Sequence, residues 1–587
     1  MLGRLHTRAT TGFAAVCLLL TIIGGRLVQV QGLDHKNYAA AAADQRSASR
    51  QLNALRGSIV DRFGTALAYT TDAQDITADP TQVPAAQRAS YAQALAPLLN
   101  QPAATLESSL AGPGQYALLA TALAPVTANK VLALDLKGIY TQATTQRQYP
   151  GQSTAANIVG LVHADGTGAA GIESQYNSVL AGKNGSLTYT LDANQNVNPN
   201  GVNTEVAPVN GGTVQLTIDQ SLQYLVQQYL DAAVSASGAR GGQVAILSAT
   251  TAQVLALASS GTYNSADPNT VNTSAPMNPP IMSVFEPGSA NKVVTFAGAV
   301  QNGIVSPQSV ITVPTTLSTG GVTVHDAWWH PAENFTATGI LAESSNIGTL
   351  LVAQKLGQKT WDDYEQAFGV GQKTGIELPG ESAGYLPPME TWSQSSFANL
   401  PFGQGESMTV LQLADMYQAI ANNGVRIPPR IVDSVTNPSG SITATTQPAG
   451  VQVVSAQTAQ TVRTMLESTM LPGGTGTKGA VAGYRIAGKT GTAQQPDPST
   501  GQYSATLNWD TFAGIVPADA PQFVVSIMID APAHGLEGGD VAAPLFREIA
   551  AYELQHANIP PTGSQSVHVP LQICDAQTRI DSPSTVC

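Results

Sequence analysis

The chain has 587 residues, a formal net charge of −13 and only 11% charged residues, while 43% of its residues are hydrophobic. This length exceeds what one domain usually needs, and the charged fraction lies well below the usual quarter. The negative charge argues against a nucleic-acid or anionic-membrane footprint. The three cysteines form no Cys-x-x-Cys pair and no His-Glu-x-x-His occurs, so we expect neither a metal nor a cofactor.

An apolar run near the N-terminus predicts a membrane anchor. Seventeen uncharged residues separate Arg8 from Arg26, which corresponds to about 26 Å of helix. We assign 1–10 to a short cytoplasmic tail and 11–30 to a transmembrane helix. A cleaved signal peptide is the alternative, but charged residues separate the apolar run from its candidate cleavage site at 39–43. The flanking charges give only a weak orientation bias.

The region 31–210 shows no catalytic spacing. It begins with an Ala- and Gln-rich stretch at 31–55, which predicts a helix or stalk, and then a short strand and turn at 56–64. Weakly amphipathic helices follow within 79–145. We therefore expect 31–210 to be a non-catalytic spacer or docking module.

The region 211–558 predicts an α+β domain. Asp219 is placed to cap a helix with one apolar face, and two strand signals follow at 243–247 and 254–258. After a helix-rich stretch at 289–469, strand signals return near the end of the region, at 484–493, 511–516 and 523–530. Early and late strands thus predict one central antiparallel sheet flanked by helices.

The last residues, 559–587, predict a loose C-terminal tail. Cys574 and Cys587 flank part of this tail. They are either a disulfide formed outside the cytoplasm or two thiols in a poorly ordered segment, and the sequence does not choose between these alternatives.

The most informative stretch is Phe285 to Lys292. A Pro-Gly turn leads into a predicted helix that begins at Ser289, and Lys292 follows three residues later on the same face. Burial and the positive end of the helix dipole both favour a neutral amine there. A neutral amine can take the proton of the serine, which activates the hydroxyl as a nucleophile.

Two further stretches support this interpretation. In the first, Ser344 can pass a proton and Asn346 can hold an amide or the lysine, although a Ser/Asn turn alone is more often structural. The second is the segment 488–493, where Lys489 supplies a cation for a carboxylate. Its other candidate substrate-binding residues are Thr490, Gly491 and Thr492.

Within that second stretch, Gly491 is expected to let a substrate chain approach an edge strand. The N–H groups of Thr492 and Ser289 are candidates for an oxyanion hole. A second Lys-Thr-Gly at Lys373 lies among glycines and prolines with no preceding strand. We interpret it as unrelated to the site.

The order Ser-x-x-Lys, Ser-x-Asn, Lys-Thr-Gly resembles penicillin-binding proteins and serine β-lactamases. The whole chain to about residue 556 is similar to class B, monofunctional penicillin-binding proteins. The N-terminal matches are Arg56-Gly57, Asp61-Arg62, Gly64 and Gly171-Ile172-Glu173, and the later ones are Gly403-Gln404-Gly405 and the segment 538–544.

The resemblance implies a peptidoglycan D,D-transpeptidase. Ser289 would attack the D-Ala-D-Ala bond of a stem peptide, with Lys292 as base, and an amine acceptor would resolve the acyl-enzyme. Ser344 would relay a proton and Asn346 would orient the substrate. Lys489, with Thr490 and Thr492, would bind the terminal carboxylate, and β-lactams would trap the nucleophile.

The same resemblance favours the septal type. It implies a single-pass membrane protein with its catalytic domain outside the cytoplasm, paired with a membrane-embedded glycosyltransferase and division proteins. A β-lactamase and a bifunctional synthase lack support, because their additional motifs are absent. A D,D-carboxypeptidase and a non-catalytic scaffold or β-lactam sensor remain as alternatives.

Overall fold

The computed structural model describes residues 2–34, 36–38, 47–192, 197–198, 203–497, 499–533 and 535–573. Cys574 and Cys587 lie outside the described residues, so their pairing stays a prediction. The chain divides into two compact units, of which the first comprises 1–55 and 182–211 and the second comprises 56–181 and 212–587.

The first unit contains the N-terminal helix and a small sheet. Helix α1 (Leu2–Val28) continues into a π-helical turn, η1 (Gln29–Leu33), and His6–Leu33 is long and apolar enough to cross a membrane. The antiparallel sheet has the order β1 (Ser47–Leu52), β6 (Gly185–Thr190), β7 (Thr204–Val206). The expected helix or stalk at 31–55 is therefore wrong for Ser47–Leu52, which is a strand.

The second unit begins with a sheet to which both halves of the chain contribute. Its order is β17 (Ile442–Ala444), β16 (Val432–Thr436), β8 (Thr213–Leu216), β2 (Ile59–Val60), β3 (Ala66–Ala78), β4 (Ala117–Leu123). Strand β5 (Ile139–Gln148) also pairs with β3, and all pairs are antiparallel except β2 with β8. Helices α3 (Arg88–Leu99), α4 (Ala103–Leu110) and α5 (Pro125–Leu132) pack beside β3 and β4 around a small apolar core.

A buried ion-pair network holds the start of this unit together. Glu173, in α7 (Gly171–Gln175), is fully buried between two guanidinium groups. Its carboxylate lies 2.6 Å from Arg56 Nε and 2.7 Å from Arg147 Nε. The glycines around Glu173 leave room for this packing, since a Cβ on Gly168 would lie 1.9 Å from the Glu173 carbonyl oxygen. Two buried cations therefore share one anion. This arrangement is stable only while all three groups are present.

The expected central antiparallel sheet is confirmed in the rest of the unit. Its order is β10 (Val254–Ser259), β9 (Gly241–Ser248), β21 (Phe523–Asp530), β20 (Tyr503–Val516), β19 (Ala487–Pro496). Early strands therefore pair with late ones, as the sequence pattern predicted, and β19 is an edge strand.

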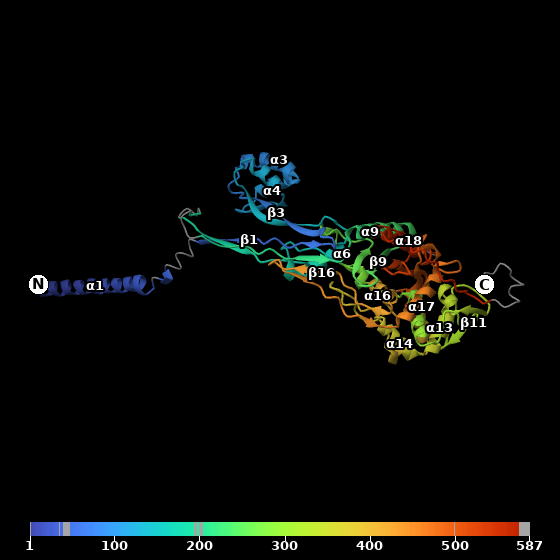
Figure 1. Ribbon diagram of the computed structural model, residues 1–587. Helices are drawn as coiled ribbons and strands as arrows, with labels where there is room; N and C mark the ends of the chain where they lie inside the picture. Colours follow the sequence, from blue (N-terminus) through green and yellow to red (C-terminus); the bar gives the residue numbers. More distant parts are fainter. Residues whose placement is uncertain are drawn as a thin grey trace. The chain divides into compact units, whose positions relative to one another are not determined.

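Alternate side chains of β9 face two different apolar cores, one on each side of the sheet. Val244 and Ile246 face α9 (Gln220–Ser237) and α18 (Ala542–His556), whereas Ala245 and Leu247 face α11 (Lys292–Gln301) and α16 (Val410–Ala421). Figure 1 shows α9 and α18 on one side of β9 and α16 on the other. The Asp219 carboxylate caps α9 by accepting from the N–H groups of Ser221 and Leu222, as predicted.

The helical part between these strands carries several short elements. Its helices are α10 (Pro279–Met282), α12 (Ala337–Ala342), α13 (Asn346–Leu356), α14 (Gln358–Ala367), α15 (Ser396–Asn399) and α17 (Ala456–Glu467). Its two-stranded sheets pair β11 (Val310–Val313) with β14 (Glu333–Thr336), β12 (Leu317–Thr319) with β13 (Val322–Val324), and β15 (Val425–Arg426) with β18 (Val451–Gln452).

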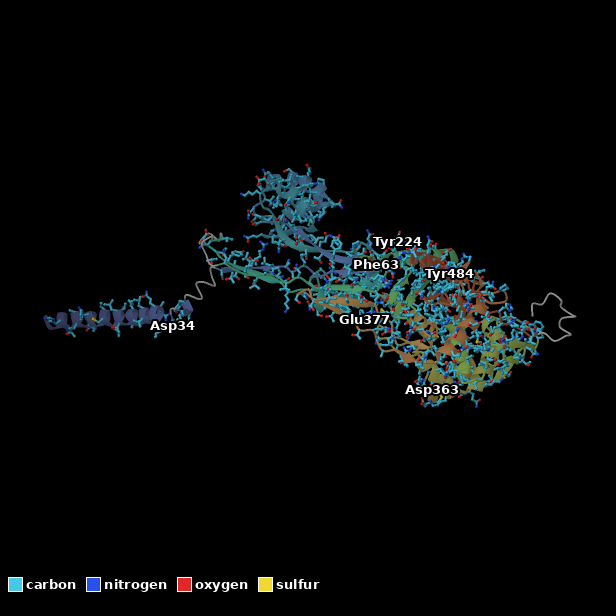
Figure 2. The ribbon with its side chains drawn as sticks, in the orientation of Figure 1. Asp34, Phe63, Tyr224, Asp363, Glu377 and Tyr484 are labelled. Carbon is cyan, nitrogen blue, oxygen red and sulfur yellow. The ribbon has the colours of Figure 1, made fainter. Side chains whose placement is uncertain are left out.

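The C-terminal segment 559–573 packs on this unit, so the expected loose tail is wrong for these residues. Leu571 O accepts from the Thr336 N–H at 2.9 Å, and the Ile573 N–H donates to Asn334 O at 2.9 Å. The Tyr484 hydroxyl, labelled in Figure 2, donates to Ile559 O at 2.6 Å. The first two bonds attach the segment to the edge of β14, and the third attaches its beginning to Tyr484.

Candidate active site

Ser289 lies in a tight turn that precedes the buried helix α11. The sequence predicted an α-helix from Ser289, but the structure has a 3₁₀ turn, η4 (Gly288–Asn291), and the α-helix begins at Lys292. Gly288 has φ +57°, and its N–H donates to Gly403 O at 3.1 Å. A Cβ on Gly403 would lie 2.1 Å from Gly288 O. These two glycines therefore allow two loops to pack closely behind the serine.

The Lys292 amine is fully buried and is held by the second motif. Its Nζ donates to Ser344 O at 2.6 Å and to Asn346 Oδ1 at 2.7 Å, and it lies 3.3 Å from Ser344 Oγ. Burial lowers the pKa of Lys292 to about 7, and the negative charge of Asp326 opposes that shift. A neutral amine is therefore available near neutral pH, as the sequence predicted.

Ser344 adopts a strained backbone conformation between two helices. Its φ is +67°, which is unusual for a residue with a side chain. Asn346 starts α13, and its side-chain amide donates to His325 O at 3.2 Å while its oxygen accepts from Lys292. The amide is thus already used inside the protein, so its expected role in orienting the substrate stays a prediction.

Asp326 was missed by the sequence analysis, although it organises this turn. One of its carboxylate oxygens accepts from the N–H groups of Asn346 at 2.5 Å and Ile347 at 3.0 Å. The other accepts from Ser345 Oγ at 2.7 Å. A single aspartate 19 positions before Ser345 carries no spacing signal, so the sequence offered no means of finding it.

Lys489 reaches the same turn from the edge strand β19. Its Nζ donates to Ser344 Oγ at 2.9 Å and to Thr490 O at 2.9 Å. Burial and the neighbouring charge of Lys292 both lower the pKa of Lys489. The Thr490 hydroxyl lies 2.6 Å from that of Thr475, and the Gly538 N–H donates to Thr492 Oγ1 at 3.2 Å.

Gly491 is tightly packed for a different reason from the one predicted. A Cβ there would lie 2.2 Å from Thr511 Oγ1 and 2.5 Å from Pro287 O. The absence of a side chain therefore lets β19 lie directly against the turn that carries Ser289. Gly491 positions the strand relative to the nucleophile, and its expected contact with substrate stays a prediction.

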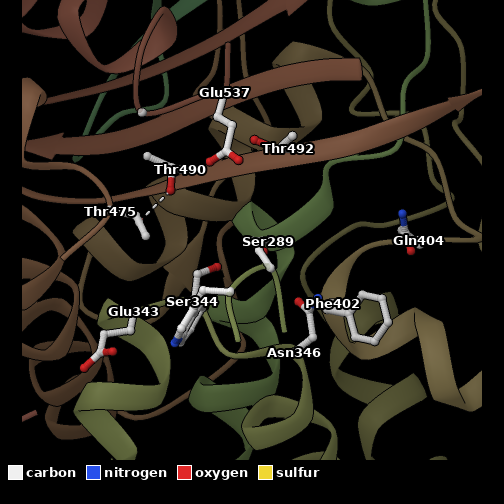
Figure 3. A pocket seen from close by; sticks show the side chains of 13 residues that line it. Ser289, Glu343, Ser344, Asn346, Phe402, Gln404, Thr475, Thr490, Thr492 and Glu537 are labelled. Carbon is white, nitrogen blue, oxygen red and sulfur yellow. Dashed lines mark hydrogen bonds between the residues drawn. The ribbon is translucent and has the colours of Figure 1, made fainter. Parts of the chain in front are cut away.

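The three motifs converge on one cleft of about 360 Å³ (Figure 3). Ser289, Ser344, Asn346, Thr490 and Thr492 line it, whereas the fully buried Lys292 and Lys489 lie behind its wall. The cleft is also lined by residues to which the sequence assigned no role: Ala327, Trp328, Glu343, Phe402, Gln404, Thr475, Glu537 and Gly539.

The second Lys-Thr-Gly, interpreted from the sequence as unrelated to the site, can be compared with this lining. Lys373 is not among the described residues that line it, and the neighbouring Thr374 hydroxyl bonds instead to Glu381. That second Lys-Thr-Gly therefore belongs to a separate loop.

Carboxyl groups lie on opposite sides of the cleft. Figure 3 shows Glu537 beside Thr490 and Thr492, and Glu343 at the far side near Ser344. Burial, with the nearby charge of Glu333, raises the pKa of Glu343 to about 7. Gln572 of the C-terminal segment donates to Glu343 at 3.3 Å.

Comparison with known proteins agrees with this geometry. Residues 242–551 match the penicillin-binding protein transpeptidase domain, and residues 51–216 match the penicillin-binding protein dimerisation domain. The chain therefore belongs to the class B penicillin-binding proteins, in which a dimerisation module precedes a transpeptidase domain.

Similar proteins match nearly the whole chain. It is 41% identical to penicillin-binding protein PbpB of Mycolicibacterium smegmatis, over 94% of this chain and 91% of that protein. It is 33% identical to the peptidoglycan D,D-transpeptidase FtsI of Escherichia coli K12, over 94% and 92%. The crystal structure of penicillin-binding protein 3 from Mycobacterium tuberculosis with aztreonam superposes with a TM-score of 0.71 at 38% identity, covering 89% of this chain and 100% of that one.

Proposed function

We propose that the Ser289 cleft cross-links peptidoglycan by D,D-transpeptidation through a serine acyl-enzyme. One observation carries this proposal. A neutral amine has two N–H bonds and one lone pair, and both N–H bonds of Lys292 are used by Ser344 O and Asn346 Oδ1. The remaining lone pair can accept a proton, so Lys292 is the general base.

The reaction has two acyl-transfer steps. Ser289 Oγ attacks the carbonyl carbon of the penultimate D-alanine, its proton passes to Lys292, and the bond to the terminal D-alanine breaks. That D-alanine leaves as an amine after taking the proton. An amine of a second stem peptide then attacks the ester carbon and passes a proton through Lys292 to Ser289 Oγ, so the ester bond breaks, Ser289 is released and the cross-link forms. The N–H groups of Ser289 and Thr492 stabilise the oxyanion in both steps.

Ser344 connects the two lysines during these steps. Its hydroxyl is close to both amines, so it can receive a proton from one group while it donates to the other. Lys489, Thr490 and Thr492 bind the terminal carboxylate of the stem peptide, because they supply a cation and two hydroxyls at one edge of the cleft. Asn346 holds Lys292 in place and orients the substrate amide.

The cellular setting is proposed on the same basis. The helix within His6–Leu33 anchors the chain as a single pass, with the catalytic domain outside the cytoplasm where peptidoglycan is found. The match to relatives named PbpB and FtsI supports a septal role. Partners would then be a membrane-embedded glycosyltransferase and division proteins, and β-lactams would acylate Ser289.

Labelling with a fluorescent penicillin tests the nucleophile. The wild-type chain should carry a long-lived covalent label that is lost in Ser289→Ala and kept in Ser283→Ala, a matched serine in the same segment. Label that persists in Ser289→Ala would contradict the proposal, and an unlabelled wild type would favour a scaffold. Mass spectrometry of a stem peptide incubated with an amine acceptor then separates a cross-linked product from the hydrolysed product of a carboxypeptidase.

A further inference from the structure

His330 lies just beyond the cleft, and both of its ring nitrogens face hydrogen-bond acceptors. Nδ1 lies 2.7 Å from Pro331 O, and Nε2 lies 3.0 Å from Asp326 Oδ2. A carbonyl oxygen only accepts, and an ionised carboxylate only accepts. A neutral imidazole has one N–H and would leave one of these contacts without a hydrogen. Only a ring with an N–H at both nitrogens satisfies both contacts.

The surroundings of Asp326 support the same assignment. Its side chain is fully buried and accepts three further hydrogen bonds, from Ser345 Oγ and from the N–H groups of Asn346 and Ile347. The Ser345 hydroxyl itself accepts from the Gly348 N–H, so its own hydrogen is directed to Asp326. Three donors favour the ionised carboxylate, and a buried anion requires a nearby cation. His330, only 4% exposed, supplies it.

This buried pair connects the cleft wall with the general base. Asp326 holds residues 345–347, which follow the strained Ser344, and Asn346 in turn holds Lys292. The His330 ring also packs against Trp328, which lines the cleft, with ring centroids 5.8 Å apart. A change in the charge at His330 therefore acts on both the shape of this wall and the electrostatics at Lys292.

We propose that His330 and Asp326 are positioning residues, a buried imidazolium–carboxylate pair that fixes the Ser344–Asn346 turn and limits the effect of the Asp326 charge on Lys292. This inference rests on the proposed role of Lys292 as the base. Other charged groups also face the pair. Glu343 senses the charge of His330 and that of Glu333, and the titratable amine of Lys489 meets that of Lys292 at Ser344 Oγ.

The two partners should shift the pH profile of acylation in opposite directions. In His330→Gln, the carboxylate of Asp326 loses its compensating cation and attracts the proton of Lys292 more strongly. The acidic limb of the acylation profile, where the rate falls as the pH falls, should therefore move to higher pH. In Asp326→Asn, that attraction is lost and the acidic limb moves to lower pH. We expect shifts of about 0.5 pH unit or more. Asp326→Asn should also lower the maximal rate about tenfold or more, because the turn loses its charged acceptor.

The experiment uses the full-length chain in detergent micelles and measures the second-order rate of acylation by a fluorescent penicillin from pH 5.5 to 9. His163→Gln, the same substitution at an exposed histidine outside the cleft, is the control and should leave the profile unchanged. A His330→Gln profile that coincides with wild type, or limbs that move in the same direction in both variants, would overturn the inference.

One further measurement keeps the result interpretable. If His330→Gln does not fold, nitrogen-15 spectra of the histidine rings in the wild type provide the test. A buried ring with both nitrogens protonated at pH 7 supports the pair, whereas a ring with one N–H contradicts it. Failure of the wild type to be acylated at all would count against the proposed function instead, so the two failures are distinguishable.

Discussion

Lys292 and Lys489 converge on one oxygen atom, Ser344 Oγ, at 3.3 and 2.9 Å. Both amines are fully buried, and two buried ammonium groups around one hydroxyl repel each other. The free site therefore favours neutral amines. If Lys489 binds the substrate carboxylate as proposed, that carboxylate would attract a proton to Lys489, which would disfavour a proton on Lys292 and leave Lys292 as the base. Carboxylate binding and base activation would then be coupled through the repulsion between the two amines.

Replacing Ser344 should separate its chemical role from its backbone strain. Ser344→Ala and Ser344→Gly both remove the hydroxyl, and we expect acylation by penicillin to fall about 10²-fold or more in each. Glycine adopts the φ of +67° without strain, so Ser344→Gly should be more stable than Ser344→Ala by about 1 kcal/mol. Stopped-flow acylation and thermal unfolding measure the two effects. Near-normal acylation in the glycine variant would show that the hydroxyl is dispensable.

Acylation should depend on pH through Lys292. The reactive form is the neutral amine, and burial lowers the pKa of Lys292 to about 7. Below this value the rate should fall about tenfold per pH unit, and above about pH 8 it should level off. Acylation rates from pH 5.5 to 9 with a β-lactam that does not itself titrate in this range test the direction. A rate that rises as the pH falls would be incompatible with a lysine base.

The two lysine motifs provide a direct contrast. Lys489→Ala should lower acylation by a carboxylate-bearing β-lactam about 10²-fold or more, because the amine that would pair with that carboxylate and its contact with Ser344 are lost. Lys373→Ala, in the other Lys-Thr-Gly, should leave the rate within about twofold, since surface substitutions have small effects. Equal losses in both variants, with both proteins folded, would show that the wrong motif was assigned to the cleft.

Sequence patterns found the candidate residues that the structure brings together at the cleft, because each motif has a fixed local spacing and lies at the end of a recognisable helix or strand. Ser289 with Lys292, and the edge strand with Lys489, are such cases. Asp326 and Thr475 were missed because they lie in loops, 19 and 15 positions before their hydrogen-bond partners Ser345 and Thr490. No periodic pattern in the sequence points to either residue. Strand β5 was missed for a related reason: buried and exposed residues do not alternate along it, so it shows no period of two.

Glu173 allows the stability of the N-terminal module to be tested apart from the chemistry. Glu173→Gln leaves two buried guanidinium groups without their anion, which should cost about 3–5 kcal/mol of unfolding free energy. Glu107→Gln, at an exposed position, should change stability by less than about 0.5 kcal/mol. Thermal unfolding followed by circular dichroism measures both. Penicillin acylation per folded molecule should be unchanged in each, because the network does not line the cleft, and a selective loss of acylation in Glu173→Gln would contradict this.

Gly491 tests the contact between the edge strand and the nucleophile turn. A Cβ in Gly491→Ala would overlap Thr511 Oγ1 at 2.2 Å and Pro287 O at 2.5 Å, so β19 must move away from Ser289. Overpacking of this kind costs about 1–3 kcal/mol, and an error of 1 Å in the position of reacting groups lowers rates about 10²-fold. We therefore expect a moderately lowered melting temperature with a much larger loss of acylation. Gly114→Ala is the control, because its Cβ would have no neighbour closer than 3.9 Å. If Gly491→Ala acylates like Gly114→Ala, the close approach of the strand to the turn is not what positions the nucleophile.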